Sequence, residues 1–335
     1  MRAMLLEFPA PIEEAPLRLV DLPPPAPGAG QILIQVSHCG VCHTDLHIIE
    51  GELPLEHLPL IPGHQVVGRV RELGPGARRF VRGERVGLAW LHHTCGECKF
   101  CLSGRENLCE KARFTGLHRD GGYAEMALAH EDFAYPLPAN ISDETAAPLL
   151  CAGIIGYRAL RLSGVRPGET LGLYGFGTSA HIAIQIARYQ GCRVLVFTRS
   201  PEHQDLARRL GAAWAGQAQD TPPVRPDRSI IFAPAGHLVT EALSALEKGG
   251  TLALAGIHMS DIPALNYEKH LFYEKTLRSV TASTRPDGQE LLELAAKIPL
   301  KPEVQLFQLE GANQALQLLK KGQINGAGVL AVGGG

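Results

Sequence analysis

The chain has 335 residues, a formal net charge of −2 and 45% hydrophobic residues. That length suggests two domains, and the hydrophobic content is ample for their cores. No run of Lys or Arg exceeds two, which disfavours nucleic-acid binding because such proteins normally carry a basic face. No segment resembles a signal peptide or reaches the roughly 18 apolar residues of a spanning helix. We therefore expect a cytoplasmic protein.

The first part of the chain is typical of strands joined by tight turns. Segments 31–41, 64–73 and 84–90 are rich in β-branched residues, and helical periodicity is nearly absent before about residue 145. Segment 144–164 then predicts one helix that ends at Gly164. This pattern favours a β-rich domain at 1–150.

The second part alternates strands and helices. Helices are predicted at 179–191, 201–211 and 238–250, between strands at 169–177, 192–200, 228–236, 251–258 and 277–284. Such alternation predicts a parallel sheet covered on both faces, the doubly wound α/β arrangement. We assign this domain to 151–284 and expect 285–335, with helices at 289–298 and 312–322 and a strand at 327–332, to return to the first domain.

Four cysteines are concentrated in one short segment, 95–109. Cys95, Cys98, Cys101 and Cys109 follow the pattern C-x-x-C-x-x-C, with the last cysteine further on. In a reducing compartment this spacing favours metal binding over disulfide formation. Four thiolates can complete a tetrahedral zinc site. A closed site of this kind is structural; an iron–sulfur cluster uses similar ligands and stays an alternative.

Other metal-ligand residue types are scattered through the chain, and each alone is weak evidence. They are Cys42, Thr44, Asp45 and His47 in CGVCHTDLH, His64 in IPGHQVVG, and Cys151 in PLLCAGIIGY. Taken in order with the four-cysteine segment and a later Gly-rich turn, they resemble the medium-chain zinc-dependent alcohol dehydrogenases, in particular bacterial propanol-preferring members. The resemblance covers essentially the whole chain.

The resemblance implies a fold and an activity. It implies a GroES-like catalytic domain, a Rossmann domain, two zinc ions per subunit, and reversible hydride transfer between a small alcohol and NAD or NADP. Cys42, His64 and Cys151 would hold the catalytic zinc, which alcohol dehydrogenases bind with two cysteines and one histidine. The reaction would proceed through a zinc-bound alkoxide, because the open metal position lowers the pKa of a bound hydroxyl.

The same resemblance assigns the residues around the metal. Thr44 would bond the substrate oxygen and His47 would pass the proton outward, a relay suited to histidine. Asp45 would orient the ligand histidine, although a Thr-Asp pair is also ordinary turn chemistry. His43 would face the cofactor phosphates. Trp90 would narrow the substrate pocket and favour short primary alcohols; its alternative role is core packing.

The remaining cysteines and two histidines carry no predicted function. We expect Cys39 and Cys192 to be packed in cores, and His92 and His93 to face solvent.

A nucleotide-binding turn is predicted where GLYGFGTSA follows a strand and opens a helix. Gly175 would make the tight turn, Gly177 would let the pyrophosphate approach the backbone, and Ala180 would take the small third position. The next strand ends at Thr198, where NAD enzymes carry an acid, and Arg199 follows. A cation without a carboxylate favours acceptance of the 2′-phosphate of NADP; an NAD enzyme without its acid is the alternative.

Three positions depart from the resembled pattern. Gln65 stands where an acid is usual, Ile155 where many relatives have Thr, and Ala327 where many have Arg. All three remove polar or charged groups near the cofactor or metal, so details of cofactor binding need not transfer.

Several functions remain open from the sequence. A zinc-dependent alcohol dehydrogenase that acts on short primary alcohols leads, with an NADPH-dependent aldehyde reductase or a polyol dehydrogenase as alternatives in the same superfamily. A zinc-free quinone reductase is disfavoured by the intact ligand set, and a non-enzymatic zinc scaffold by the nucleotide-binding turn. The resemblance also suggests a homodimer or homotetramer formed through edge strands near 251–284.

Overall fold

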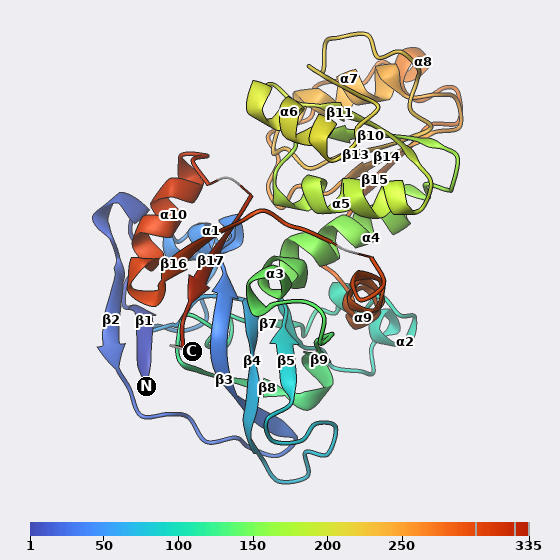
Figure 1. Ribbon diagram of the computed structural model, residues 1–335. Coiled ribbons are helices and arrows are strands. Elements are labelled where there is room, and N and C mark those ends of the chain that lie inside the picture. Colours follow the sequence, from blue (N-terminus) through green and yellow to red (C-terminus); the bar gives the residue numbers. More distant parts are fainter. Residues whose placement is uncertain (299, 325, 334–335) are drawn as a thin grey trace. The chain divides into compact units, whose positions relative to one another are not determined.

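A computed structural model describes residues 1–298, 300–324 and 326–333 (Figure 1). The chain forms two compact units, one from Met1–Cys151 with Ala282–Gly335 and one from Ala152–Thr281. Within the described parts of the chain, every helix is too short or too polar to cross a membrane.

The first unit is built on a seven-stranded mixed sheet. Its path runs β16-β17-β3-β4-β5-β9, and β8 also pairs with β3. These strands are β3 (Gln31–Gly40), β4 (Gln65–Leu73), β5 (Arg85–Leu88), β8 (Met126–His130), β9 (Ala134–Pro136), β16 (Val304–Gln308) and β17 (Ala327–Ala331). The late strands β16 and β17 therefore complete a sheet begun near the N-terminus.

Shorter elements surround that sheet. Two separate two-stranded sheets are formed by β1 (Arg2–Leu6) with β2 (Leu17–Asp21), and by β6 (Leu91–His93) with β7 (Arg113–Phe114). The helices are α1 (His43–Ile49), α2 (Lys99–Leu102), α3 (Asp143–Pro148), α9 (Arg285–Ala295) and α10 (Ala312–Lys320), with short 3-10 turns at Ile12–Glu14, Glu106–Leu108, Glu131–Phe133 and Leu309–Gly311. One hydrophobic cluster unites β1, β3, β4, α1 and α10.

The second unit contains a six-stranded, wholly parallel sheet in the order β12-β11-β10-β13-β14-β15. The strands are β10 (Thr170–Tyr174), β11 (Arg193–Phe197), β12 (Trp214–Gly216), β13 (Arg228–Ile231), β14 (Thr251–Leu254) and β15 (Thr276–Ser279). The helices are α4 (Ile154–Ser163), α5 (Thr178–Tyr189), α6 (Pro201–Arg209), α7 (His237–Ala245) and α8 (Tyr267–His270).

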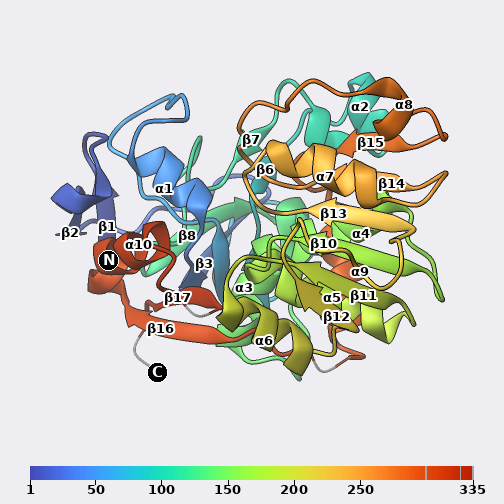
Figure 2. The same cartoon turned by 90° about the horizontal axis from the view of Figure 1, so that it is seen from above.

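This sheet confirms the predicted doubly wound α/β class, with the parallel strands buried by helices on both faces. Figure 1 shows α7 and α5 on opposite faces of the sheet, and Figure 2 shows the strands in sequence from β15 to β12. The connection from β12 to β13 is the exception, because residues 217–227 contain no helix. Trp214 and Val224 instead pack onto the cluster around Tyr174 and Phe197.

One sequence prediction about helices is wrong, and a second is confirmed with one difference. Residues 43–49 form α1 although no helical period is evident there; a capping box at Cys42 and Asp45 and the burial of Leu46, Ile48 and Ile49 stabilise this short helix. Segment 144–164 is helical as predicted, but it is not α-helical throughout, since a π-helical turn at Leu149–Gly153 lies between α3 and α4. Gly164 does end α4, with φ of 71°.

Candidate metal centres and nucleotide-binding turn

Three ligand side chains from distant parts of the first unit meet at one point. The donor atoms of Cys42, His64 and Cys151 all lie within 4.8 Å of one another, and the two sulfurs are 3.9 Å apart. Cys42 is the N-cap of α1, His64 immediately precedes β4, and Cys151 lies in the π-helical turn. A π-turn shifts the side chains that follow it, and such turns are frequent at functional sites.

The buried carboxylate of Asp45 connects two of these ligands. Its Oδ1 lies 2.9 Å from Nδ1 of His64, and its Oδ2 accepts from the backbone N–H of Cys42 at 2.9 Å. The hydroxyl of Tyr123 donates to the same Oδ2 at 3.1 Å. Asp45 is fully buried, so these three donors compensate a charge that would otherwise be costly to bury.

The contact with Asp45 decides which nitrogen of His64 faces the cluster. Nδ1 is engaged by the carboxylate, whereas Nε2 is buried without a hydrogen-bond partner among the described residues. Buried polar atoms are rarely left unpaired, and metal-ligating histidines usually give their other nitrogen to a carboxylate or carbonyl. The orphaned Nε2 and the two sulfurs therefore fit a zinc ion with one coordination position left open.

The electrostatics of the cluster favour metal binding. A hydrogen bond from Cys151 lowers the pKa of Cys42 well below its usual value, with help from His64, and the same contact raises the pKa of Cys151. Burial opposes the imidazolium of His64, but Asp45 and Cys42 outweigh it and raise its pKa to about 10. These groups attract positive charge strongly, and a zinc ion held by them would replace the protons that they otherwise share.

The four cysteines of 95–109 form a second cluster in the first unit. Their sulfurs also lie within 4.8 Å of one another, with Cys98 and Cys101 at 3.5 Å and Cys95 and Cys109 at 3.6 Å. All are free thiols. Four sulfur donors complete a tetrahedral shell, so the chemistry of this set fits a closed, structural zinc site.

An ion pair attaches this cysteine-rich segment to the rest of the unit. Glu106 is buried and accepts four hydrogen bonds from Arg285, from its backbone N–H and its guanidinium, at 2.6–3.1 Å. The guanidinium of Arg285 also lies over the ring of Phe133, 4.5 Å from the centroid. The N-terminus of α9 thereby holds the segment at a fixed place.

Aromatic and hydroxyl groups surround the three-ligand cluster. Trp90 meets the ring of His64 edge-on, with centroids 5.1 Å apart at 74°, and stacks on Phe114 at 4.7 Å and 8°. The hydroxyl of Thr44 is 3.6 Å from the sulfur of Cys42. His47 lies one helical turn further along α1, and its Nδ1 is 2.5 Å from Oε2 of the exposed Glu52.

The Gly-rich turn of the second unit has the form expected of a nucleotide-binding turn. Gly175 has φ of 82°, and a Cβ there would lie 2.9 Å from the backbone of Ala233. A Cβ at Gly177, the N-cap of α5, would meet nothing within 4 Å. Ala180 is fully buried. The open space at the start of α5 fits a pyrophosphate that accepts from the free N–H groups of the helix.

The structure also gives the burial and location of the other residues named in the sequence analysis. Thr198 is buried at the end of β11 and donates its N–H to Gly216, while Arg199 and His43 are exposed. Gln65 is buried over Gly40, Ile155 lies half-buried in α4, and Ala327 is buried at the start of β17. Cys39 and Cys192 are buried and belong to neither cluster.

One expectation about the loop after Trp90 is wrong. His93 is exposed, but His92 is 8% exposed, because residues 91–93 form a strand that turns His92 inward against Thr115.

Four residues that contact the predicted site residues or the segments that carry them were not identified from the sequence. They are Tyr123, which donates to Asp45; Glu52, beside His47; Phe114, beneath Trp90; and Arg285, which holds Glu106. Glu52 could have been suspected from its place just after α1, but the other three join segments far apart in the sequence.

Comparison with known proteins agrees with these sites. Residues 28–139 match the family described as "Alcohol dehydrogenase GroES-like domain", and residues 180–297 match "Zinc-binding dehydrogenase". A probable alcohol dehydrogenase, AdhA, of Mycobacterium tuberculosis is 49% identical over 99% of this chain and 97% of its own. An alcohol dehydrogenase of Geobacillus stearothermophilus is 37% identical over 95% of this chain and 96% of its own.

Solved structures show the same fold. An NAD-dependent alcohol dehydrogenase superposes with a TM-score of 0.91, at 28% identity over 99% of this chain and all of the other. The chain therefore belongs to the medium-chain zinc-dependent alcohol dehydrogenase family. It is an NAD(P)-dependent oxidoreductase with a GroES-like and a Rossmann-type domain, and its four-cysteine and Cys-His-Cys sites indicate two zinc ions.

Substitution of one cysteine of the four-sulfur site should remove one zinc ion and leave the other site intact. In Cys98→Ser the four-sulfur shell is broken, so we expect the zinc content to fall from two ions to one per chain and the unfolding free energy to drop by about 4 kcal/mol or more. Elemental analysis and thermal unfolding measure this. The control is Cys192→Ser, a buried cysteine outside both clusters. Two zinc ions retained in Cys98→Ser would contradict the assignment.

Proposed function

We propose that the chain catalyses reversible hydride transfer between a short primary alcohol and NAD(P), at the cluster of Cys42, His64 and Cys151. The observation that supports this most is the open three-donor set with an orphaned Nε2 on His64 beside a bulky Trp90. A zinc ion held there supplies Lewis acidity, which lowers the pKa of a hydroxyl in its open position.

Thr44 and His47 are proposed to move the proton. The Thr44 hydroxyl lies beside the ligand sulfur of Cys42 and is 5% exposed, so it can accept a hydrogen bond from the substrate hydroxyl in a site from which water is largely excluded. His47 is half-buried in the same helix and reaches the exposed carboxylate of Glu52. The imidazole is therefore placed between the buried part of α1 and solvent, as an outward proton carrier requires.

Trp90 is proposed to limit the size of the substrate. Its edge rests against His64 and its face is covered by Phe114, so its ring is held from two sides. An indole fixed next to a metal ligand leaves less room there than a smaller side chain would. This favours short unbranched alcohols and weighs against a polyol substrate.

Replacement of Trp90 tests the proposed activity. In Trp90→Ala we expect kcat/KM for branched or aromatic primary alcohols to rise by roughly 10-fold relative to ethanol and propanol, since a changed pocket contact is typically worth 10-fold or more. The measurement is absorbance of the reduced nicotinamide across a panel of alcohols. Trp214→Phe in the second unit is the control for loss of an indole, and an unchanged selectivity in Trp90→Ala would refute the proposed role.

His47 should matter for rate rather than for metal binding. We expect His47→Gln to lower kcat roughly 100-fold, the usual contribution of a positioned proton carrier, and added imidazole to restore part of the loss. Glu52→Gln should cost less, because the imidazole remains. Zinc content should not change, and His57→Gln, an exposed histidine in the next loop, should resemble the wild type. Full activity of His47→Gln would exclude the relay.

The cofactor is proposed to include NADP. Thr198 is neutral and Arg199 is exposed beside it, so no carboxylate at this strand end repels a 2′-phosphate. The same pair supports the second candidate function, reduction of bulkier aldehydes with NADPH. We expect kcat/KM with NADP to be at least comparable to that with NAD, and Arg199→Gln to shift the ratio toward NAD. A strong NAD preference in the wild type would end this proposal.

The subunits are proposed to associate through the edge of the second unit's sheet. β15 is an edge strand, and Phe272 and Tyr273 just before it are 55% and 45% exposed. Exposed aromatic groups beside the open edge of a sheet are typical of association surfaces. A homodimer or homotetramer follows, and a sedimentation mass of one 36.0 kDa chain would contradict it.

A further inference from the structure

A cavity of about 330 Å³ opens in the first unit away from the metal ligands. Its walls come from the N-terminal segment, the start of β3, the residue Ile61, strand β6, the turn at 119–120 and strand β8, and none of the seven cluster residues is among them. The volume is at the small end of the range for small-molecule sites, roughly 300–1,000 Å³. We call it the Arg119 cavity.

Most of the Arg119 cavity is apolar. Side chains that offer no hydrogen bonds form the larger part of the wall, chiefly those of Leu22, Pro25, Ile61, Met126 and Leu128. An alkyl chain laid against these groups would leave water, which is favourable in proportion to the area buried.

Arg119 and His92 both border the cavity, as does Gln31, and Arg119 is near enough to act on the charge of the His92 ring. Arg119 is exposed, and among the described residues its side-chain hydrogen bond is from Nη1 to the carbonyl of His118 at 2.6 Å, which leaves Nε and Nη2 available. His92 is buried, and its side-chain contact is a marginal one of 3.5 Å between Nδ1 and Thr115 Oγ1. That contact is too long to fix the tautomer, so Nε2 can carry the ring proton.

The charges around His92 are not balanced. Burial, with smaller contributions from the nearby Arg119, His93 and His130, lowers the pKa of His92 to about 4. The ring is thus neutral at pH 7 beside a guanidinium that forms no salt bridge in the described parts of the chain. An anion at this point would accept from both groups and relieve the positive potential.

We propose that the Arg119 cavity binds a small apolar monocarboxylate, with its carboxylate accepting from the guanidinium of Arg119 and from Nε2 of His92, and its alkyl chain against Ile61 and Leu128. This site is separate from the proposed alcohol site and does not depend on it.

Asp120 limits where the carboxylate can lie. It also borders the cavity, and its Oδ1 accepts from the backbone N–H of Ile61 at 2.9 Å. A bound anion must therefore occupy the side of Arg119 and His92. Asn at this position keeps the acceptor for Ile61 and removes the charge, so it isolates the electrostatic effect.

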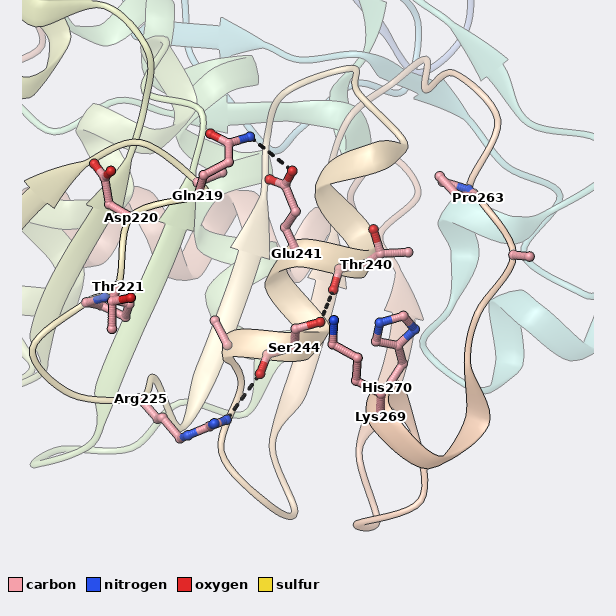
Figure 3. Close-up of a pocket in the computed structure, with 14 residues that line it drawn as sticks. Gln219, Asp220, Thr221, Arg225, Thr240, Glu241, Ser244, Pro263, Lys269 and His270 are labelled. Carbon is pink, nitrogen blue, oxygen red and sulfur yellow. Dashed lines mark hydrogen bonds between the residues drawn. The ribbon is translucent and has the colours of Figure 1, made fainter.

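The larger cavity of the second unit lacks this selectivity. It measures about 630 Å³ and lies between the helix-free connection after β12 and the helix α7 (Figure 3). Arg225 and Lys269 border it together with Asp220 and Glu241, and Glu241 is already bonded to Gln219. Opposite charges on its walls favour no single class of ligand.

Calorimetry of the zinc-loaded protein with hexanoate tests the proposal. We expect saturable binding at millimolar concentration, with weaker binding of acetate, which lacks the chain, and of hexanamide, which lacks the charge. Arg119→Gln should weaken hexanoate binding about 10-fold or more, as loss of a charged hydrogen bond usually does. Asp120→Asn should strengthen it, and Leu22→Trp, which fills the cavity, should abolish it.

The matched control is Arg113→Gln, whose arginine pairs with Glu56 and does not border the cavity. It should bind hexanoate like the wild type. Because carboxylates also bind zinc, equal affinity in the wild type and in Arg119→Gln would place hexanoate at the metal and overturn the proposal. Failure of the wild type to bind, or tighter binding of hexylamine than of hexanoate, would overturn it as well. None of these outcomes depends on the enzyme's activity toward alcohols.

Discussion

The buried carboxylate of Asp45 is the interaction on which the catalytic half of the molecule depends. It joins the backbone of one metal ligand, Cys42, to the ring of another, His64, and Tyr123 completes its hydrogen bonds. An isolated buried carboxylate would be strongly unfavourable, so the three donors and the charge must be assembled together. The same contact closes the capping box of α1, which explains why a seven-residue helix forms where no hydrophobic period predicts one. Local structure, ligand orientation and charge balance therefore have one common cause.

The two metal sites obtain their ligands by opposite routes. The four cysteines lie within residues 95–109, so their spacing alone shows that they can close on one ion. The other three ligands are brought together only when the sheet containing β3 and β4 is formed and the π-helical turn aims Cys151 inward. This difference explains how much of the site could be predicted. Sequence spacing alone predicts the four-cysteine site and the glycines of the nucleotide turn. The ligand role of Cys42, His64 and Cys151 required a family resemblance. The structure supports it, since the two sulfurs are 3.9 Å apart and all three donor atoms lie within 4.8 Å of one another.

What the sequence could not predict are contacts across the chain. Tyr123 lies 78 residues from Asp45, and Arg285 lies 179 residues from Glu106, and neither has a local pattern that marks it. The burial of His92 has a related cause, because the pairing of β6 with β7, two segments separated in the sequence, fixes which side chains of that short strand turn inward. The fold class was accessible because strands and helices alternate regularly after residue 169. The helix-free connection at 217–227 breaks that regularity without changing the class, since β12 and β13 still join the parallel sheet.

In the proposed function, Trp90 links the size of the substrate pocket to the metal centre. One edge of the indole contacts His64 and its face lies on Phe114. A change of Trp90 would therefore remove packing from a zinc ligand as well as a wall of the proposed pocket. Phe114 touches the indole but belongs to β7, whose position is set by pairing with β6. His118 in turn flanks Phe114, with ring centroids 5.4 Å apart. Substitutions at Phe114 can therefore tilt or release the indole while Asp45 continues to hold His64. We therefore expect substitutions that alter substrate size to be tolerated better at Phe114 than at Trp90. Phe114 acts on the indole through aromatic packing, which can rearrange, whereas Trp90 contacts His64, which the buried Asp45 network holds in one position.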